Sequence, residues 1–140
     1  MNPILKNILI TVCGAFVGAM VNMAIVMLGG SVVPPPPSVD STTIEGLAAG
    51  MPLMSPMHFL FPFLAHAAGT FAAAALISRF AASHHLQLAM IVSALFFVGG
   101  LQMVLSLPSP MWFNATDLIL AYFPMGWLGN KIAGNSQHVF

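Results

Sequence analysis

The sequence predicts an all-α membrane protein: a four-helix transmembrane bundle with an up-down-up-down course and both termini in the cytoplasm. Three observations predict this class. Apolar residues make up 59% of the 140 residues and charged residues 4%, whereas about 25% of an ordinary soluble domain is charged. Four apolar stretches each approach the roughly 20 residues that a helix needs to cross a bilayer. The three basic residues all fall on one side of a chain that crosses four times.

We expect one integral membrane domain over 1–140, with spans at about 4–28, 57–79, 86–106 and 111–130. The first span ends at Gly29-Gly30, and Arg79 lies between the second and third. Pro108 and Pro110 separate the third from the fourth, because proline cannot continue a helix. The stretches are apolar all round, which favours helices over alternating strands. Pro124 predicts a kink within the fourth span.

The basic residues predict the orientation of these spans. Lys6, Arg79 and Lys131 follow the N-terminus, the second span and the fourth span, and the other two loops carry no Lys or Arg. Basic residues gather on the cytoplasmic side of a membrane, so we expect a multi-pass protein of the cell inner membrane. The lipid bilayer is then the expected partner, and the zero net charge excludes a basic nucleic-acid binder.

The segment 31–56 is the only long polar stretch and is expected on the outer side. Pro34–Pro37 predicts a stiff polyproline rod. A short helix is expected from about Thr43 to Ala49, with a capping-box spacing between Thr42 and Glu45. The segment is either a connector at the membrane surface or a lid over a site, and in the second case Glu45 is the lid candidate.

Polar residues inside the spans are the candidates for function, because polar groups are costly in hydrocarbon. At a rise of about 1.5 Å per residue, all four helices place their main polar residues in the outer half of the bilayer. Small residues beside Asn22, His66 and Asp117 predict that these three point inward together. The candidates for binding a ligand or a proton are Asn22, His58, His66, Thr70, Gln102, Asn114 and Asp117.

Several chemistries fit this set. A His66–Asp117 pair can share a proton, as in membrane proton relays. A metal site from His58, His66, Asp117 and Glu45 requires Pro62 to break the helix, since eight residues separate the two histidines. The histidines allow haem, but no motif requires it. The same residues can also simply hold helices together.

The sequence therefore specifies neither a metal nor a cofactor. The single cysteine, Cys13, excludes an internal disulfide and a cysteine-rich metal site. No nucleophile and base stand at a recognisable spacing, so an enzyme is the least favoured class and no catalytic residue is assigned.

Longer stretches resemble a group of small bacterial four-helix membrane proteins. The stretches are Val21-Asn22-Met23, the proline run near Pro34, Phe61–Thr70, Leu107–Phe113, Asp117-Leu118 and Ala121–Gly129. The resemblance covers most of the chain. It implies a bacterial inner-membrane location and four spans, and it implies nothing about chemistry.

Two classes of function follow. The first is a small non-catalytic membrane subunit or scaffold, whose polar residues only fix how the helices pack. The alternative is a small transporter or a ligand- or proton-binding protein that uses the polar cluster. Small bundles bury modest surface, so a homo-oligomer or a larger membrane complex is expected. Its contact faces would be Ala72–Ala75 and the Gly14/Gly18 stripe.

Overall fold

The structure is a computed structural model that describes residues 1–135. Its helices are α1 (Pro3–Val32), α2 (Ile44–Gly50), the 3-10 helix η1 (Met51–Leu53), α3 (Met57–Phe80), α4 (His85–Ser106), α5 (Met111–Leu120) and α6 (Phe123–Asn135). No strand occurs in the described range. The predicted all-α class is confirmed.

Three helices, α1, α3 and α4, are long and apolar enough to cross a membrane, which supports the prediction of a membrane protein. They match the first three predicted spans to within a few residues at each end. The predicted fourth span, 111–130, differs, because residues 111–135 form two helices of 10 and 13 residues rather than one. Pro124 has no N–H to give to Leu120, and its ring crowds that carbonyl. The first helix therefore ends at Leu120.

The helix boundaries follow from local chemistry. The side chain of Asn2 accepts a hydrogen bond from the backbone N–H of Ile4 at 2.8 Å and caps α1. α1 ends at Val32, one residue before the Val33-Pro34 step, where proline disfavours helical backbone. His84 precedes α4 with a φ of 57°, a left-handed conformation that lets the chain reverse between α3 and α4.

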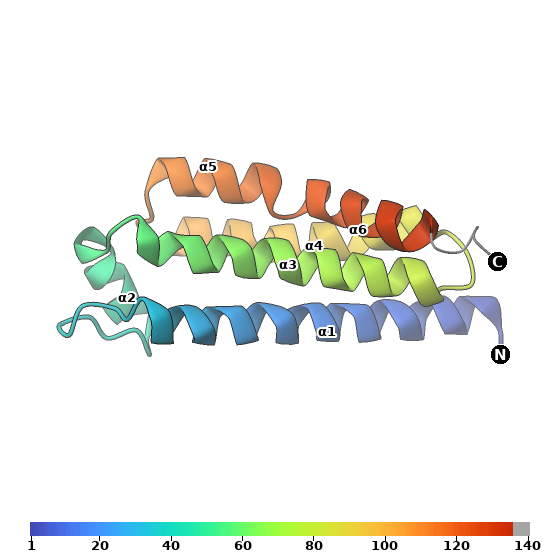
Figure 1. Cartoon of the computed structure of the whole chain (residues 1–140), viewed down its shortest axis with the longest axis horizontal. Coiled ribbons are helices and arrows are strands. Elements are labelled where there is room, and N and C mark those ends of the chain that lie inside the picture. Colours follow the sequence, from blue (N-terminus) through green and yellow to red (C-terminus); the bar gives the residue numbers. More distant parts are fainter. Residues whose placement is uncertain (136–140) are drawn as a thin grey trace.

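The long helices lie side by side, and α5 and α6 follow one another as a fourth column (Figure 1). The N-terminus, the α3–α4 turn and the end of α6 lie at one end, and the 33–56 segment lies at the other. α3 is the central helix. In its most apolar 18-residue stretch 39% is buried within the chain, against 11% in the corresponding stretch of α1. The core is made of small and aliphatic side chains of α3 with Val92, Ala121 and Tyr122.

α1 and α3 cross with their backbones in contact. A Cβ added to Gly18 would lie 2.6 Å from the carbonyl oxygen of Gly69, and one added to Gly69 would lie 2.7 Å from the carbonyl oxygen of Gly18. At Gly14 the added atom would meet Ile77 at 2.6 Å. The prediction that the Gly14/Gly18 stripe allows close approach is confirmed.

The stripe and the alanine run are nevertheless not free contact faces for a second chain. Gly14 and Gly18 are buried against α3, and Ala73 and Ala74 at the centre of the alanine run have no exposed surface. These buried residues serve packing within this chain, so the prediction of a contact face was wrong for the Gly14/Gly18 stripe and for Ala73 and Ala74.

The 33–56 segment is ordered by its own hydrogen bonds. Thr43 caps α2 by accepting from the N–H of Gly46 at 3.0 Å, which places the cap one residue after the predicted Thr42. The side chain and backbone N–H of Thr42 instead donate to the Asp40 carboxylate. These two hydrogen bonds, the side-chain one first, hold the pKa of Asp40 below its ordinary value of 3.8.

Candidate functional site

A histidine, a carboxylate and a tyrosine meet in the interior. Nδ1 of His66 on α3 lies 2.8 Å and 3.0 Å from the two carboxylate oxygens of Asp117 on α5. The hydroxyl of Tyr122 donates to Oδ2 of the same carboxylate at 3.0 Å. The His66 and Tyr122 rings also stack, with centroids 5.6 Å apart and planes at 28°. Residues 51 positions apart in the chain thus form one hydrogen-bonded group.

The break between α5 and α6 makes this group possible. Five residues separate Asp117 and Tyr122, which in a continuous helix would turn them well away from each other. α5 ends at Leu120, so Tyr122 leaves the helical path and returns to Asp117. Gly100 on α4 makes room for it, because an added Cβ there would lie 2.1 Å from the Tyr122 hydroxyl.

Burial assigns different roles to the two partners. The Asp117 side chain is 2% exposed, whereas the His66 side chain is 24% exposed. An ionised carboxylate only accepts hydrogen bonds, so it fixes the hydrogen of a neutral His66 ring on Nδ1. The lone pair of the ring is then at Nε2, since the hydrogen bonds of the ring to described residues are both on Nδ1. Asp117 orients the His66 ring and leaves Nε2 available as a hydrogen-bond acceptor.

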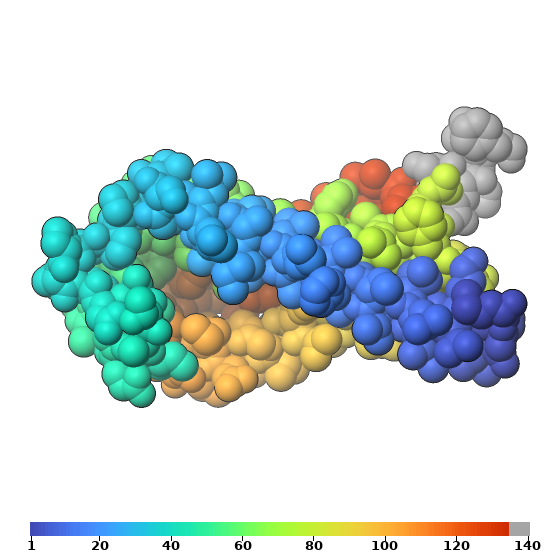
Figure 2. Space-filling view, turned by 90° about the horizontal axis from the view of Figure 1, so that it is seen from below, coloured from blue at the N-terminus to red at the C-terminus, as the bar shows by residue number. Residues whose placement is uncertain are grey.

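His66 borders a cavity of about 230 Å³ between α1, α3 and α4. Its wall is largely apolar, and it consists of Ala19, Asn22, His66, Gly69, Thr70, Leu95, Phe96, Gly99, Gly100, Met103 and Tyr122. Figure 2 shows the hollow on the long side of the molecule, between α1 in blue to cyan and α4 in orange. The cavity therefore opens sideways, across the helix axes, rather than at an end of the bundle.

Asn22 supplies a second polar group to this wall. Its Oδ1 is a buried atom without a hydrogen-bond partner among the described residues. Leaving a buried acceptor unpaired is unfavourable, so a donor that reached this oxygen would be stabilising. Thr70 is fully buried on the same wall, but its hydroxyl already donates to the backbone carbonyl of His66 at 2.8 Å.

The structure brings four predicted residues together, namely Asn22, His66, Thr70 and Asp117. Of the others, His58 lies in the first turn of α3 and serves the outer segment. Its Nδ1 accepts from the backbone N–H of Ser55 at 3.1 Å, and its Nε2 lies 3.1 Å from the carbonyl oxygen of Pro34. Both ring nitrogens are thus used for local structure, and His58 does not line the cavity.

Asn114, Gln102 and Glu45 are also outside the cluster. Asn114 is buried, but its amide bonds to Ser109 and holds the α4–α5 connection. Gln102 lies on the exposed surface of α4, and Glu45 is exposed at the start of α2. Neither lines the cavity, so its described wall offers no lid residue.

Tyr122 is the functional residue that sequence reasoning missed. It stands in the predicted fourth span, but helical spacing places it on a different face from Asp117. The sequence signal for the position of Tyr122 was Pro124, two residues later. A helix that ends before a proline no longer fixes the direction of the side chains that follow it, so helical spacing does not apply to Tyr122.

No group of three or more His, Cys, Asp or Glu side chains within 1–135 is arranged to hold a metal ion. The described cluster is an imidazole–carboxylate pair with a tyrosine, three groups that can form hydrogen bonds and exchange protons.

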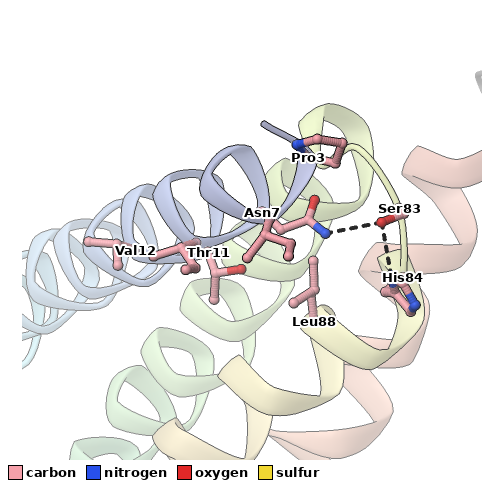
Figure 3. Close-up of a pocket in the computed structure, with 9 residues that line it drawn as sticks. Pro3, Asn7, Thr11, Val12, Ser83, His84 and Leu88 are labelled. Carbon is pink, nitrogen blue, oxygen red and sulfur yellow. Dashed lines mark hydrogen bonds between the residues drawn. The ribbon is translucent and has the colours of Figure 1, made fainter. Parts of the chain in front are cut away.

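A second cavity, of about 400 Å³, lies near the other end of the bundle between the starts of α1 and α4. Its polar groups largely bind one another, as Figure 3 shows for Asn7, Ser83 and His84. Asn7 also accepts from the backbone N–H of Ala82 at 2.8 Å. These bonds tie α1 to the α3–α4 turn, and this cavity has no paired carboxylate and imidazole.

Comparison of the chain with protein-family models, with curated proteins and with solved structures gives no match. The geometry around His66 is therefore the basis on which a function is assigned.

Proposed function

We propose that this protein is a small multi-pass protein of the bacterial inner membrane that binds a small ligand, with or without a proton, at His66. The observation that carries the proposal is a partly exposed imidazole at a cavity wall whose Nδ1 is held by a buried carboxylate. A hydrogen-bonded pair that only joined two helices would need no cavity beside it. Here His66 itself borders one.

The proposed frame is a four-helix bundle in which the α5–α6 column crosses the bilayer beside α1, α3 and α4. Lys6, Arg79 and Lys131 stand near the start of α1, the end of α3 and the end of α6. These three places lie at one end of the bundle (Figure 1). The positive-inside rule makes that end cytoplasmic, and it puts the His66 cavity in the outer half.

Polar groups in hydrocarbon favour a role for this cluster. A buried carboxylate is expensive in a membrane, and residues of this kind commonly mark ion, proton or ligand pathways. Other polar pairs in the protein have a simpler use: Ser78 donates to Asn130 at 2.9 Å and joins α3 to α6. If His66–Asp117 did no more than this, the protein would be a non-catalytic subunit or scaffold.

Native mass spectrometry separates these two functions. The full chain is extracted in mild detergent from its own membrane, and the mass bound per chain is measured for wild type, His66→Gln and the matched control His58→Gln. We expect wild type and His58→Gln to retain the same bound mass and His66→Gln to lose it. A clean chain mass in wild type, or a bound mass that His66→Gln retains, would support the scaffold.

A further inference from the structure

The ligand class can be narrowed from the shape, polarity and opening of the cavity, and this step rests on the proposed function. The opening lies along the side of the bundle, between α1 and α4 (Figure 2). When the helices span a bilayer, this side faces acyl chains rather than water. The ligand therefore arrives dissolved in the membrane, and any tail it carries leaves through the same opening.

The charge of the wall excludes two kinds of head group. No Lys or Arg lines the cavity, so nothing in the wall would pair with a phosphate. No Asp or Glu lines it either, because the Asp117 carboxylate lies behind His66 and Tyr122. A phospholipid head group and a cationic amine both lack a partner here, which leaves an uncharged head.

The hydrogen-bonding groups of the wall require donors from the ligand. Nε2 of a neutral His66 offers a lone pair, and the buried Oδ1 of Asn22 is an acceptor without a partner. The Thr70 and Tyr122 hydroxyl hydrogens are committed to the His66 carbonyl and to Asp117. Two unfilled acceptors on one wall match a head with two hydroxyl groups.

The size and the neighbours point to a ring. A space of about 230 Å³ takes one substituted six-membered ring and has no room for a nucleotide. Phe96 and Tyr122 present aromatic surfaces to it, and Met103 and Leu95 supply further apolar contact. Aromatic and thioether side chains pack well against a flat ring.

We propose that the cavity binds a lipid-soluble hydroquinone. One ring hydroxyl donates to Nε2 of His66, the other donates to Oδ1 of Asn22, and the apolar tail leaves the bundle between α1 and α4. Binding in this form transfers no electron and breaks no bond.

The test compares decyl-hydroquinone, kept reduced, with its dimethyl ether, which has the same ring and tail but no donor. The full-length protein in phospholipid nanodiscs is titrated with each, and apparent Kd is taken from the rise in Tm followed by tryptophan fluorescence. We expect saturable binding of the hydroquinone and at least tenfold weaker binding of the ether. Equal binding of the two compounds, or no binding of either, would overturn the proposal.

Two variants and one control test whether the hydroquinone binds in this cavity. Asn22→Leu should weaken hydroquinone binding about tenfold, whereas Gln102→Leu, the same kind of change on the exposed face of α4, should leave it unchanged. Gly99→Leu should weaken binding at least tenfold by placing a side chain at the cavity wall, since Gly99 lines the cavity and an added Cβ there meets no atom within 4 Å. Undiminished binding to Gly99→Leu would also overturn the proposal.

Together, native mass spectrometry and the hydroquinone titration separate failure of the hydroquinone assignment from failure of the proposed function. In native mass spectrometry, we expect wild type to retain a bound mass that His66→Gln loses. If decyl-hydroquinone does not displace that mass, the hydroquinone assignment is wrong and ligand binding at His66 is still supported. A clean wild-type mass together with no hydroquinone binding overturns both.

Discussion

At the scale of single residues, the site depends on a carboxylate that is satisfied from two sides. Asp117 receives Nδ1–H of His66 and the hydroxyl of Tyr122. Each donor lowers the free energy of holding a charge in a nearly closed environment. The Tyr122 ring is held in turn by stacking on His66 and by an edge contact with Phe97. Removing the hydroxyl and keeping the ring isolates one of these donors.

We expect Tyr122→Phe to lower the free energy of unfolding by about 1–2 kcal/mol, because it removes one hydrogen bond to a buried carboxylate and preserves both ring contacts. Unfolding by SDS titration in mixed micelles measures this difference. Ser106→Ala is the control, since its hydroxyl donates to the Gln102 carbonyl on an exposed face and its loss should cost under about 0.5 kcal/mol. Equal effects of the two changes would remove Tyr122 from the group.

Gly100→Ala should act on the same hydroxyl from the opposite side. The added Cβ would lie 2.1 Å from the Tyr122 oxygen and 2.6 Å from Cζ, and such overpacking costs about 1–3 kcal/mol. Gly99→Ala is the matched control, because its Cβ meets nothing within 4 Å. The same SDS titration should show a smaller cost of Gly100→Ala in a Tyr122→Phe background. Simple additivity of the two changes would contradict the contact.

For single residues, the sequence predicted the site only in part. The inward meeting of His66 and Asp117 followed from their depth and from the small residues on their faces. Gln102 has a similar depth but lies on the exposed surface, because depth along a helix does not fix rotation about it. Tyr122 could not be placed without knowing how the chain turns between Leu120 and Phe123.

At the scale of helices, close contact between α1 and α3 sets the position of Asn22 on the cavity wall. The two backbones touch at Gly18 and Gly69, one turn of α1 before Asn22. A side chain at this crossing would push the helices apart and move Asn22 away from His66. The crossing is therefore part of the site although neither glycine carries a functional group.

Gly18→Ala should destabilise the protein by about 1–3 kcal/mol, because its Cβ would lie 2.6 Å from a backbone carbonyl that cannot turn aside. Gly30→Ala in the same helix meets nothing within 4 Å and should be neutral or stabilising by up to about 1 kcal/mol, since alanine favours helix. Thermal unfolding of both variants gives the signs. Destabilisation by Gly30→Ala of the same size would show that helix propensity, rather than the crossing, decides the result.

The connector before α2 should respond to acid through Asp40. Its pKa is lowered by the hydrogen bonds from Thr42, so its contribution to local stability is present at neutral pH. That contribution is lost as the pH falls through the lowered pKa. We expect the Thr42 amide proton to titrate in NMR spectra with a midpoint below 3.8, the ordinary value. The inflection should vanish in Asp40→Asn. A midpoint at or above 3.8 would contradict the hydrogen bonds.

Helix boundaries were the most predictable feature at this scale. Apolar runs bounded by Arg79 and the Pro108–Pro110 turn predicted α3 and α4 closely, whereas the end of the first span at Gly29-Gly30 was wrong, because α1 continues through both glycines to Val32. In these runs the composition and the breakers give the same answer. The fourth run gave conflicting signals, since its apolar character favours one helix and Pro124 favours two. The structure follows the proline.

At the scale of the whole molecule, the location of the cavity depends on the α5–α6 column crossing the bilayer. Three crossings would leave α5 and α6 on the outer side and place the end of α6 opposite to Ser83. Four crossings put Ser83 and the end of α6 on the same side. Single cysteines distinguish these arrangements after Cys13→Ala removes the native thiol. The positions chosen are Pro36→Cys, Ser83→Cys, Ser109→Cys and Gly134→Cys.

We expect a membrane-impermeant maleimide added to intact spheroplasts to label the cysteines at 36 and 109 and to spare those at 83 and 134 until the membrane is opened. The reason is that Lys6, Arg79 and Lys131 would all remain on the cytoplasmic side. Gly134 suits the test because an added Cβ there meets no atom within 4 Å. Labelling at 134 with protection at 83 would mean three crossings, and the carboxylate of Asp117 would then pair with His66 outside a four-helix bundle.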